Sequence, residues 1–144
     1  MHITSHTDYA LRMLMFLQVA PGGSATVRDV SEAYDISANH LAKVAQSLVA
    51  RGWVESRRGR GGGLVLAEDT PSLRLGALVQ ELEPDALVEC HTSESTCPIE
   101  PACKLKGIFS EGLQAFYEAL NRYTLADLAK RPKDLARLFV RAEG

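Results

Sequence analysis

The chain has 144 residues, of which 46% are hydrophobic and 24% charged, the composition of an ordinary soluble globular protein. This length fits one domain, or a small domain with an appended arm. The formal net charge of −2 is unevenly distributed. Residues 1–66 hold seven Lys/Arg against five Asp/Glu, whereas residues 67–144 hold nine against thirteen. The first half is therefore better suited to approach a polyanion than the second.

The N-terminal sequence MHITSHTDYALR lacks the basic start and following apolar run of a signal peptide. The apolar stretches at 9–19 and 108–120 are interrupted and too short to cross a membrane. We therefore expect a cytoplasmic protein with no membrane partner, in a compartment that keeps thiols reduced.

The first expected element is an amphipathic helix over residues 8–20. Thr7 is a candidate N-cap, Asp8 falls in the first turn, and Pro21-Gly22-Gly23 would end the helix. The helix prediction depends on four apolar side chains spaced to share one face, Ala10, Met13, Leu14 and Leu17.

Two more helices are expected next, joined by a short turn. Thr26 and Asp29 form a plausible capping box for the first, which would end at Tyr34-Asp35. Ser37 is a good N-cap for the second, which would stop at Gly52. The apolar face of this second helix is made of Leu41, Val44, Ala45, Leu48 and Val49. Two short helices in this order predict a helix-turn-helix.

The segment from Trp53 to Leu66 predicts a β-hairpin wing. Trp53-Val54-Glu55-Ser56 and Leu64-Val65-Leu66 have strand composition, and a basic glycine-rich loop separates them. A solvated basic turn is the plain alternative. A nucleotide-binding loop is excluded because no Gly-Lys-Ser/Thr follows and no helix begins there.

The outer face of the third helix and the wing together predict a surface for double-stranded operator DNA. Amide side chains can bond adenine, lysine can reach guanine or phosphate, and arginines suit phosphates or a narrow minor groove. Glycines would let the backbone approach closely. The predicted DNA-contacting residues are Ser37, Ala38, Asn39, His40, Lys43, Arg57, Arg58, Arg60, Gly61 and Gly62.

The second half predicts a short apolar helix over Leu73 to Leu82, then a long helix with one apolar seam. The seam residues recur at intervals of four and three, as in a coiled coil. Burial within one small domain is one explanation, but DNA readers of this type usually bind two half-sites as dimers. We therefore expect a homodimer formed through Phe109, Leu113, Phe116, Leu120 and Tyr123. A short helix is expected after Thr124.

All three cysteines of the chain, Cys90, Cys97 and Cys103, lie within fourteen residues between these two helices. An odd number leaves one sulfur over after pairing, whereas three thiolates can hold a metal or an iron–sulfur cluster with one further ligand. Their spacers are too long for a zinc knuckle. Thiol redox switching and inert thiols remain alternatives. No His–Asp pair is recognisable beside them, so we do not expect an enzyme.

Several segments resemble the winged-helix family of iron–sulfur regulators that includes IscR. They are SHTDYALRMLMFL at 5–17, ISANHLAKVAQSLVARGWV at 36–54, RGRGGGLVLA at 58–67, LVQELEP at 78–84, CPIEPACKLKGIF at 97–109 and LNRYTLADL at 120–128. PACKLKG and YTLADL are the most specific, and they resemble the nitric-oxide-sensing repressors of that family rather than the family at large.

The resemblance implies a cluster of the [4Fe–4S] type, with [2Fe–2S] as the alternative, ligated by Cys90, Cys97 and Cys103. It implies a fourth ligand from the partner protomer at the position of Asp8. The alternative is that Asp8 is a first-turn carboxylate that interacts favourably with the helix dipole. Substitute fourth ligands would be His6, His91, Glu94 and Glu100.

Two features depart from the family pattern. The spacer between Cys90 and Cys97 is six residues, one longer than expected, and Lys106 stands where IscR-like members carry a histidine. The second departure argues against an IscR-type [2Fe–2S] site.

The implied function is a dimeric repressor that nitric oxide releases from operator DNA. An iron–sulfur status regulator and a metal-free cysteine redox switch are the alternatives. We expect a mainly α fold with a small β-hairpin wing, a winged helix-turn-helix plus a long dimerisation helix. The expected parts are a DNA-binding domain at 1–83, a cluster-binding loop at 84–106, and the dimerisation helix with its tail at 107–144.

Overall fold

The computed structural model describes residues 2–84 and 86–141. Residues 1, 85 and 142–144, which fall in the three expected parts, lie outside the described residues. The expected fold class is confirmed, because helices dominate and a small antiparallel sheet forms the wing. The elements are α1 (Ser5–Val19), β1 (Ser24–Ala25), α2 (Val27–Tyr34), α3 (Ala38–Ala50), β2 (Val54–Arg57), β3 (Gly63–Leu66), α4 (Leu75–Leu82), α5 (Lys104–Leu120) and α6 (Pro132–Arg141).

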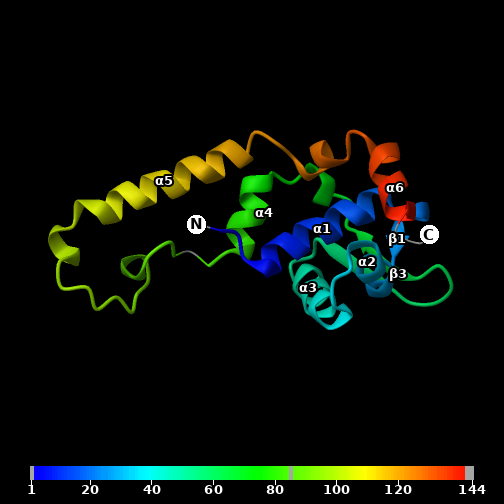
Figure 1. Ribbon diagram of the computed structural model, residues 1–144, viewed down its shortest axis with the longest axis horizontal. Coiled ribbons are helices and arrows are strands. Elements are labelled where there is room, and N and C mark those ends of the chain that lie inside the picture. Colours follow the sequence, from blue (N-terminus) through cyan, green and yellow to red (C-terminus); the bar gives the residue numbers. More distant parts are fainter. Residues whose placement is uncertain (1, 85, 142–144) are drawn as a thin grey trace.

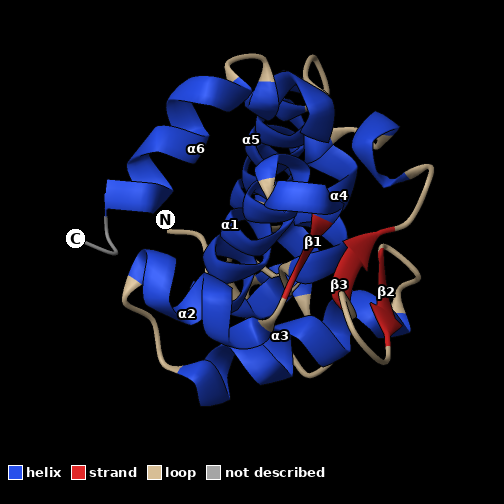
Figure 2. Ribbon diagram, turned by 90° about the vertical axis from the view of Figure 1, so that its right-hand side faces the viewer, coloured by secondary structure: helices blue, strands red, loops and turns tan. Residues whose placement is uncertain are grey.

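Helices α2 and α3 and the sheet form the winged helix-turn-helix (Figure 2). The capping box predicted for α2 is present, since Thr26 Oγ accepts from Asp29 N at 3.1 Å and Asp29 Oδ2 accepts from Thr26 N at 2.7 Å. Ser37 occupies the N-cap position of α3, but its side chain makes no capping hydrogen bond. The expected hairpin is confirmed, with strand order β1-β3-β2. The two-residue strand β1 was not predicted.

Helix α1 is the central element of the core, and its predicted start was wrong. It begins at Ser5 and its N-cap is Thr4, whose side chain accepts from Thr7 N. Thr7 is instead fully buried. The start is fixed from outside the helix, because Glu83 Oε1 accepts from Thr4 N at 2.8 Å and from Thr4 Oγ1 at 2.9 Å.

The C-terminal part of α5 packs against α4, and the rest of α5 extends as an arm away from the body of the protein, with the cysteine loop at its far end (Figure 1). Gly76 allows the close approach, because a Cβ there would overlap the carbonyl oxygen of Tyr117. Tyr117 is only 4% exposed, although the seam prediction did not include it. Tyr123, which that prediction placed on the helix, lies beyond the helix end at Leu120.

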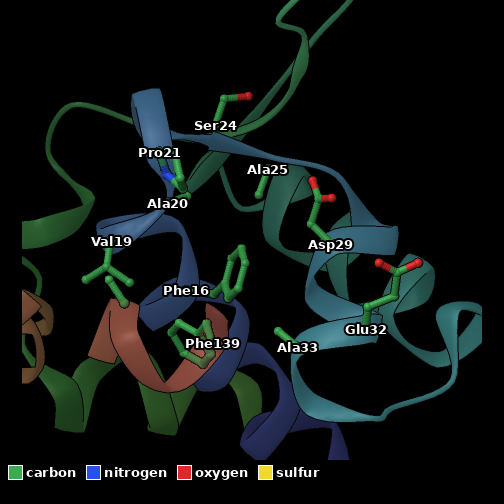
Figure 3. Close-up of a pocket in the computed structure, with 11 residues that line it drawn as sticks. Phe16, Val19, Ala20, Pro21, Ser24, Ala25, Asp29, Glu32, Ala33 and Phe139 are labelled. Atoms are coloured by element: carbon green, nitrogen blue, oxygen red, sulfur yellow. The ribbon is translucent and has the colours of Figure 1, made fainter. Parts of the chain in front are cut away.

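The chain after α5 stays on the body of the protein and packs against α1. A 3-10 turn over Leu125–Ala129 buries Leu125, and the short helix expected after Thr124 forms later, as α6. Phe139 on α6 packs against Phe16 and Tyr34, with ring centroids 4.8 and 5.2 Å apart. A cavity of about 350 Å³ lies beside these rings, between α1, α2 and α6 (Figure 3).

Candidate functional site

The residues predicted to contact DNA at the start of α3 are all exposed. Ser37, Ala38, Asn39, His40 and Lys43 lie at the start and in the first two turns of α3. The opposite face of the helix is anchored in the core. A helix held in this way can present its N-terminal polar side chains to a major groove.

The wing lies beside α3, which contacts β2 (Figure 2). Arg57, Arg58 and Arg60 are exposed on the wing. Gly61 has a φ of 70°, and a Cβ at Gly62 would lie 2.5 Å from the carbonyl oxygen of Arg57. The tight loop therefore depends on these glycines.

Positive charge on the wing is concentrated on two of its arginines. Arg57 pairs with Glu55 at 3.6 Å, which partly offsets its charge. In the part of the chain that the structure describes, neither Arg58 nor Arg60 forms an ion pair, so both are available to phosphates.

The three cysteines are free and half-buried. Cys90 lies in the 3-10 turn Glu89–His91, and Cys103 is the N-cap of α5. Glu89 ties the loop together, since its Oε1 accepts from Thr96 N at 2.8 Å and from Thr96 Oγ1 at 2.9 Å. These bonds lower the pKa of Glu89, and they connect the turn that carries Cys90 to the residue before Cys97.

The loop also contacts the first turns of α5. His91 Nε2 lies 3.2 Å from Lys106 O and 3.3 Å from Ser110 Oγ. Lys106 forms an ion pair with Glu100, which lowers the pKa of Glu100. Glu100 first, and Cys90 after it, raise the pKa of Lys106, so a positive charge lies close to one of the thiols.

The donor set fits an iron–sulfur cluster in its chemistry, since three thiols share one loop and none is in a disulfide. Across residues 2–84 and 86–141, no three His, Cys, Asp or Glu side chains lie close enough together to hold a metal ion. The single chain therefore supplies the donors without bringing them into a preformed site. Of the substitute ligands, His91 and Glu100 have the partners described above, and His6 Nε2 lies 3.2 Å from Ser47 Oγ.

Asp8 lies in the first turn of α1, on an exposed part of its surface. Arg12 makes a bidentate contact with the Asp8 carboxylate, from Nε to Oδ1 at 3.1 Å and from Nη2 to Oδ2 at 3.0 Å. This hydrogen bonding raises the pKa of Arg12. Tyr34 on α2 also contacts Arg12. Its ring centroid lies 5.6 Å from the guanidinium carbon, and its hydroxyl donates to Arg12 O at 3.1 Å. Burial raises the pKa of Tyr34 to about 12, so this donor keeps its proton. Sequence reasoning did not identify Arg12, although its i,i+4 spacing from Asp8 is a signal.

The arm carries an uncovered apolar surface. Leu105, Ile108 and Phe109 are 52%, 61% and 38% exposed. Leu113, Phe116 and Leu120 are half-buried. Leu105 extends the predicted seam toward the cysteines.

Comparison with known proteins assigns the chain to a family. The model of the Rrf2 family, described as iron-dependent transcriptional regulators, matches residues 3–131. The chain belongs to the Rrf2 family of transcriptional regulators. It is 41% identical over 141 residues to the HTH-type transcriptional regulator NsrR of Bacillus subtilis, covering 96% of this chain and 97% of that protein. The resemblance read from the sequence is thereby confirmed, as is the expectation that the chain is a regulator rather than an enzyme.

Solved structures share the Rrf2 fold. One from Listeria innocua, described as a putative transcriptional regulator, is 27% identical with a TM-score of 0.68, covering 91% of this chain and 88% of that one. IscR of T. potens is 21% identical with a TM-score of 0.71, covering 90% and 87%. At that identity IscR supports the winged-helix fold alone. No helix in the described residues is both long and apolar enough to cross a membrane.

Proposed function

We propose that this Rrf2 regulator is a homodimeric, cytoplasmic repressor that binds operator DNA and senses nitric oxide through an iron–sulfur cluster of the [4Fe–4S] type. The observation that carries the proposal is the 41% identity to NsrR over nearly the whole of both chains. The three free cysteines in one loop beside α5 support it, because they supply three of the four ligands that such a cluster takes.

Cys90, Cys97 and Cys103 would hold the cluster, with the partner's Asp8 as the fourth ligand. When bound, the cluster supplies iron that reacts with nitric oxide. Lys106, held by its ion pair with Glu100, would place a positive charge beside the loop that carries Cys90. Arg12 would fix the carboxylate of Asp8 on its own protomer until that carboxylate engages the partner's loop.

The apolar face of α5 would join two protomers. Leu105, Ile108 and Phe109 are exposed in the single chain, and an exposed apolar patch of this kind marks an interaction surface. Pairing along α5 would set the distance between two α3 helices. Consecutive half-sites on one face of DNA lie about 34–36 Å apart.

Ligands contributed from two protomers would make operator binding depend on the cysteine loop. With Asp8 and the partner's Cys90 held in one site, the angle between the protomers is fixed. Once these residues separate, the protomers are free to rotate and the two α3 helices no longer reach both half-sites. Loss of simultaneous docking would release the repressor.

Variants of the ligands test the proposal. Wild type, Cys97→Ala and Asp8→Ala would be purified without oxygen, with Ser93→Ala as a control in the same loop. Iron and sulfide content, and binding to operator DNA with and without nitric oxide, would be measured. We expect Cys97→Ala to lose the cluster and Asp8→Ala to weaken its retention, while Ser93→Ala behaves as wild type. A Cys97→Ala protein that keeps both cluster and nitric oxide response would overturn the proposal.

A further inference from the structure

The recognition helix α3 is tied at its C-terminal end to the helix that precedes the cysteine loop. Arg51, the C-cap of α3, donates from Nη1 to Ser47 Oγ at 2.6 Å and to Ser47 O at 3.2 Å. Its Nη2 donates to the carbonyl oxygen of Glu81 at 3.1 Å. One guanidinium therefore bridges α3 and α4.

The acceptor on α4 is a carbonyl that the helix itself cannot satisfy. Glu81 lies in the last turn of α4, where carbonyls lack intrahelical partners. The positive charge of an arginine near a helix C-terminus also interacts favourably with the helix dipole. Arg51 thus caps α4 from the neighbouring helix, and the capped residue, Glu81, lies nine positions before Cys90 in the sequence.

The same junction contacts the N-terminal end of α1. His6 Nε2 lies 3.2 Å from Ser47 Oγ, the atom to which Arg51 donates. Glu83, directly after α4, accepts two hydrogen bonds from Thr4 at the start of α1. The end of α3 therefore contacts both segments that lead to the proposed cluster ligands, the start of α1 and the end of α4.

The position of Arg51 is further defined by Trp53, whose ring centroid lies 5.8 Å from the guanidinium carbon. Trp53 is 8% exposed and belongs to the core. A planar guanidinium that stacks on a ring and donates in two directions sets a geometry that the single ammonium of lysine cannot reproduce.

We propose that Arg51 is a positioning residue that couples the cysteine loop to the recognition helix. The inference rests on the proposed function and names the route by which the state of the loop reaches α3. A shift of the end of α4 or of the start of α1 alters the contacts of Arg51 and Ser47, and so changes the orientation of α3. By thermodynamic linkage, DNA on α3 affects the loop to the same extent.

The test compares operator affinity in the cluster-loaded and cluster-free states. The probe is a DNA duplex selected from a randomised pool by the cluster-loaded wild type. Wild type, Arg51→Lys and Ser47→Ala would be compared, with Arg122→Lys, an exposed arginine after α5, as the matched control. The charge-preserving Arg51→Lys keeps any general attraction to phosphate but loses the two-directional bridge.

We expect Arg51→Lys to reduce the ratio of cluster-free to cluster-loaded Kd by about fivefold or more, within the usual range of allosteric coupling. Ser47→Ala should reduce it as well, and the double variant should be less than additive. The absorption spectrum and the iron content should be those of wild type, and the urea midpoint of the cluster-free protein should fall only slightly, because the lost hydrogen bonds belong to an exposed side chain. Arg122→Lys should keep the full ratio.

Each contrary outcome has a distinct meaning. If wild type binds the duplex equally in both states, the proposed function and the coupling both fail. If wild type shows a large ratio and Arg51→Lys retains it, the role of Arg51 is refuted while the proposed function stands. If Arg51→Lys weakens both states equally, Arg51 contacts DNA and does not couple the loop to α3.

Discussion

Replacing Gly76 with alanine should weaken the junction from which the arm extends. An ideal Cβ at this position overlaps the carbonyl oxygen of Tyr117 and lies 2.5 Å from Asn121 Oδ1. That Oδ1 accepts from Ala77 N at 3.0 Å, so moving it would also break a hydrogen bond at the start of α4. Backbone on one side and a bonded amide on the other leave little room to relax.

Overpacking of this kind costs about 1–3 kcal/mol. Alanine in place of glycine within a helix returns about 0.5–1 kcal/mol. We therefore expect the free energy of unfolding to fall by about 1–2 kcal/mol, and Tm to fall by about 2–4 °C per kcal/mol in a chain of this size.

Urea unfolding of the cluster-free protein at one fixed concentration would measure the change. The matched control is Gly107→Ala in α5, where a Cβ meets nothing within 4 Å. That substitution should stabilise the protein by about 0.4–1 kcal/mol. A Gly76→Ala variant as stable as wild type, beside a stabilised control, would refute the packing argument.

Three further predictions concern the wing, the arm and the start of α1. Arg60→Ala should weaken operator binding across sequences and reduce the slope of log affinity against log salt by about 1, and an unchanged salt dependence would remove the wing from the DNA surface. Ile108→Glu should give a monomer of 15.7 kDa in sedimentation, because Ile108 is 61% exposed in the single chain; a dimer that persists would place the interface elsewhere. For Glu83, burial raises the pKa, but hydrogen bonds from Thr7 and Thr4 outweigh it and leave the pKa lowered. Glu83 therefore stabilises the fold above the pKa of an unfolded glutamate, about 4.3, and this stabilisation is lost as pH falls through the lowered folded value. Glu83→Gln should thus be less stable than wild type at neutral pH, with a difference that shrinks in acid, and a difference independent of pH would contradict the assignment.

Local signals in the sequence were sufficient for the helix-turn-helix and the wing. The Thr26–Asp29 capping box is complete within four residues, and the glycine-rich loop between two apolar runs defines a hairpin without help from the rest of the chain. Both depend on interactions close in sequence, so both predictions were confirmed.

Errors arose where distant contacts decide the outcome. Thr4 and Thr7 are both acceptable N-caps, and Glu83, 79 residues away, selects Thr4. The predicted apolar seam included Tyr123 because of its spacing alone. The helix ends at Leu120, and the chain then turns and buries Leu125 against the body.

The candidate site was predictable in its residues but not in its contacts. The cysteines and Asp8 follow from composition and resemblance. The pairing of Arg12 with Asp8 has a local i,i+4 spacing, but the contacts of Tyr34 with Arg12 and of Arg51 with Glu81 join helices whose packing no local pattern specifies. Assembly of the three thiols with the partner's Asp8 remains a proposal.

The most direct test of the account is a titration of nitric oxide into the anaerobic protein bound to a fluorescent operator duplex, following visible absorbance and DNA anisotropy in one sample. We predict a brown protein whose cluster absorbance bleaches in parallel with DNA release. A protein that binds the duplex but carries no iron, even after reconstitution with iron and sulfide, would contradict the account. Bleaching that leaves the DNA complex intact would contradict it as well.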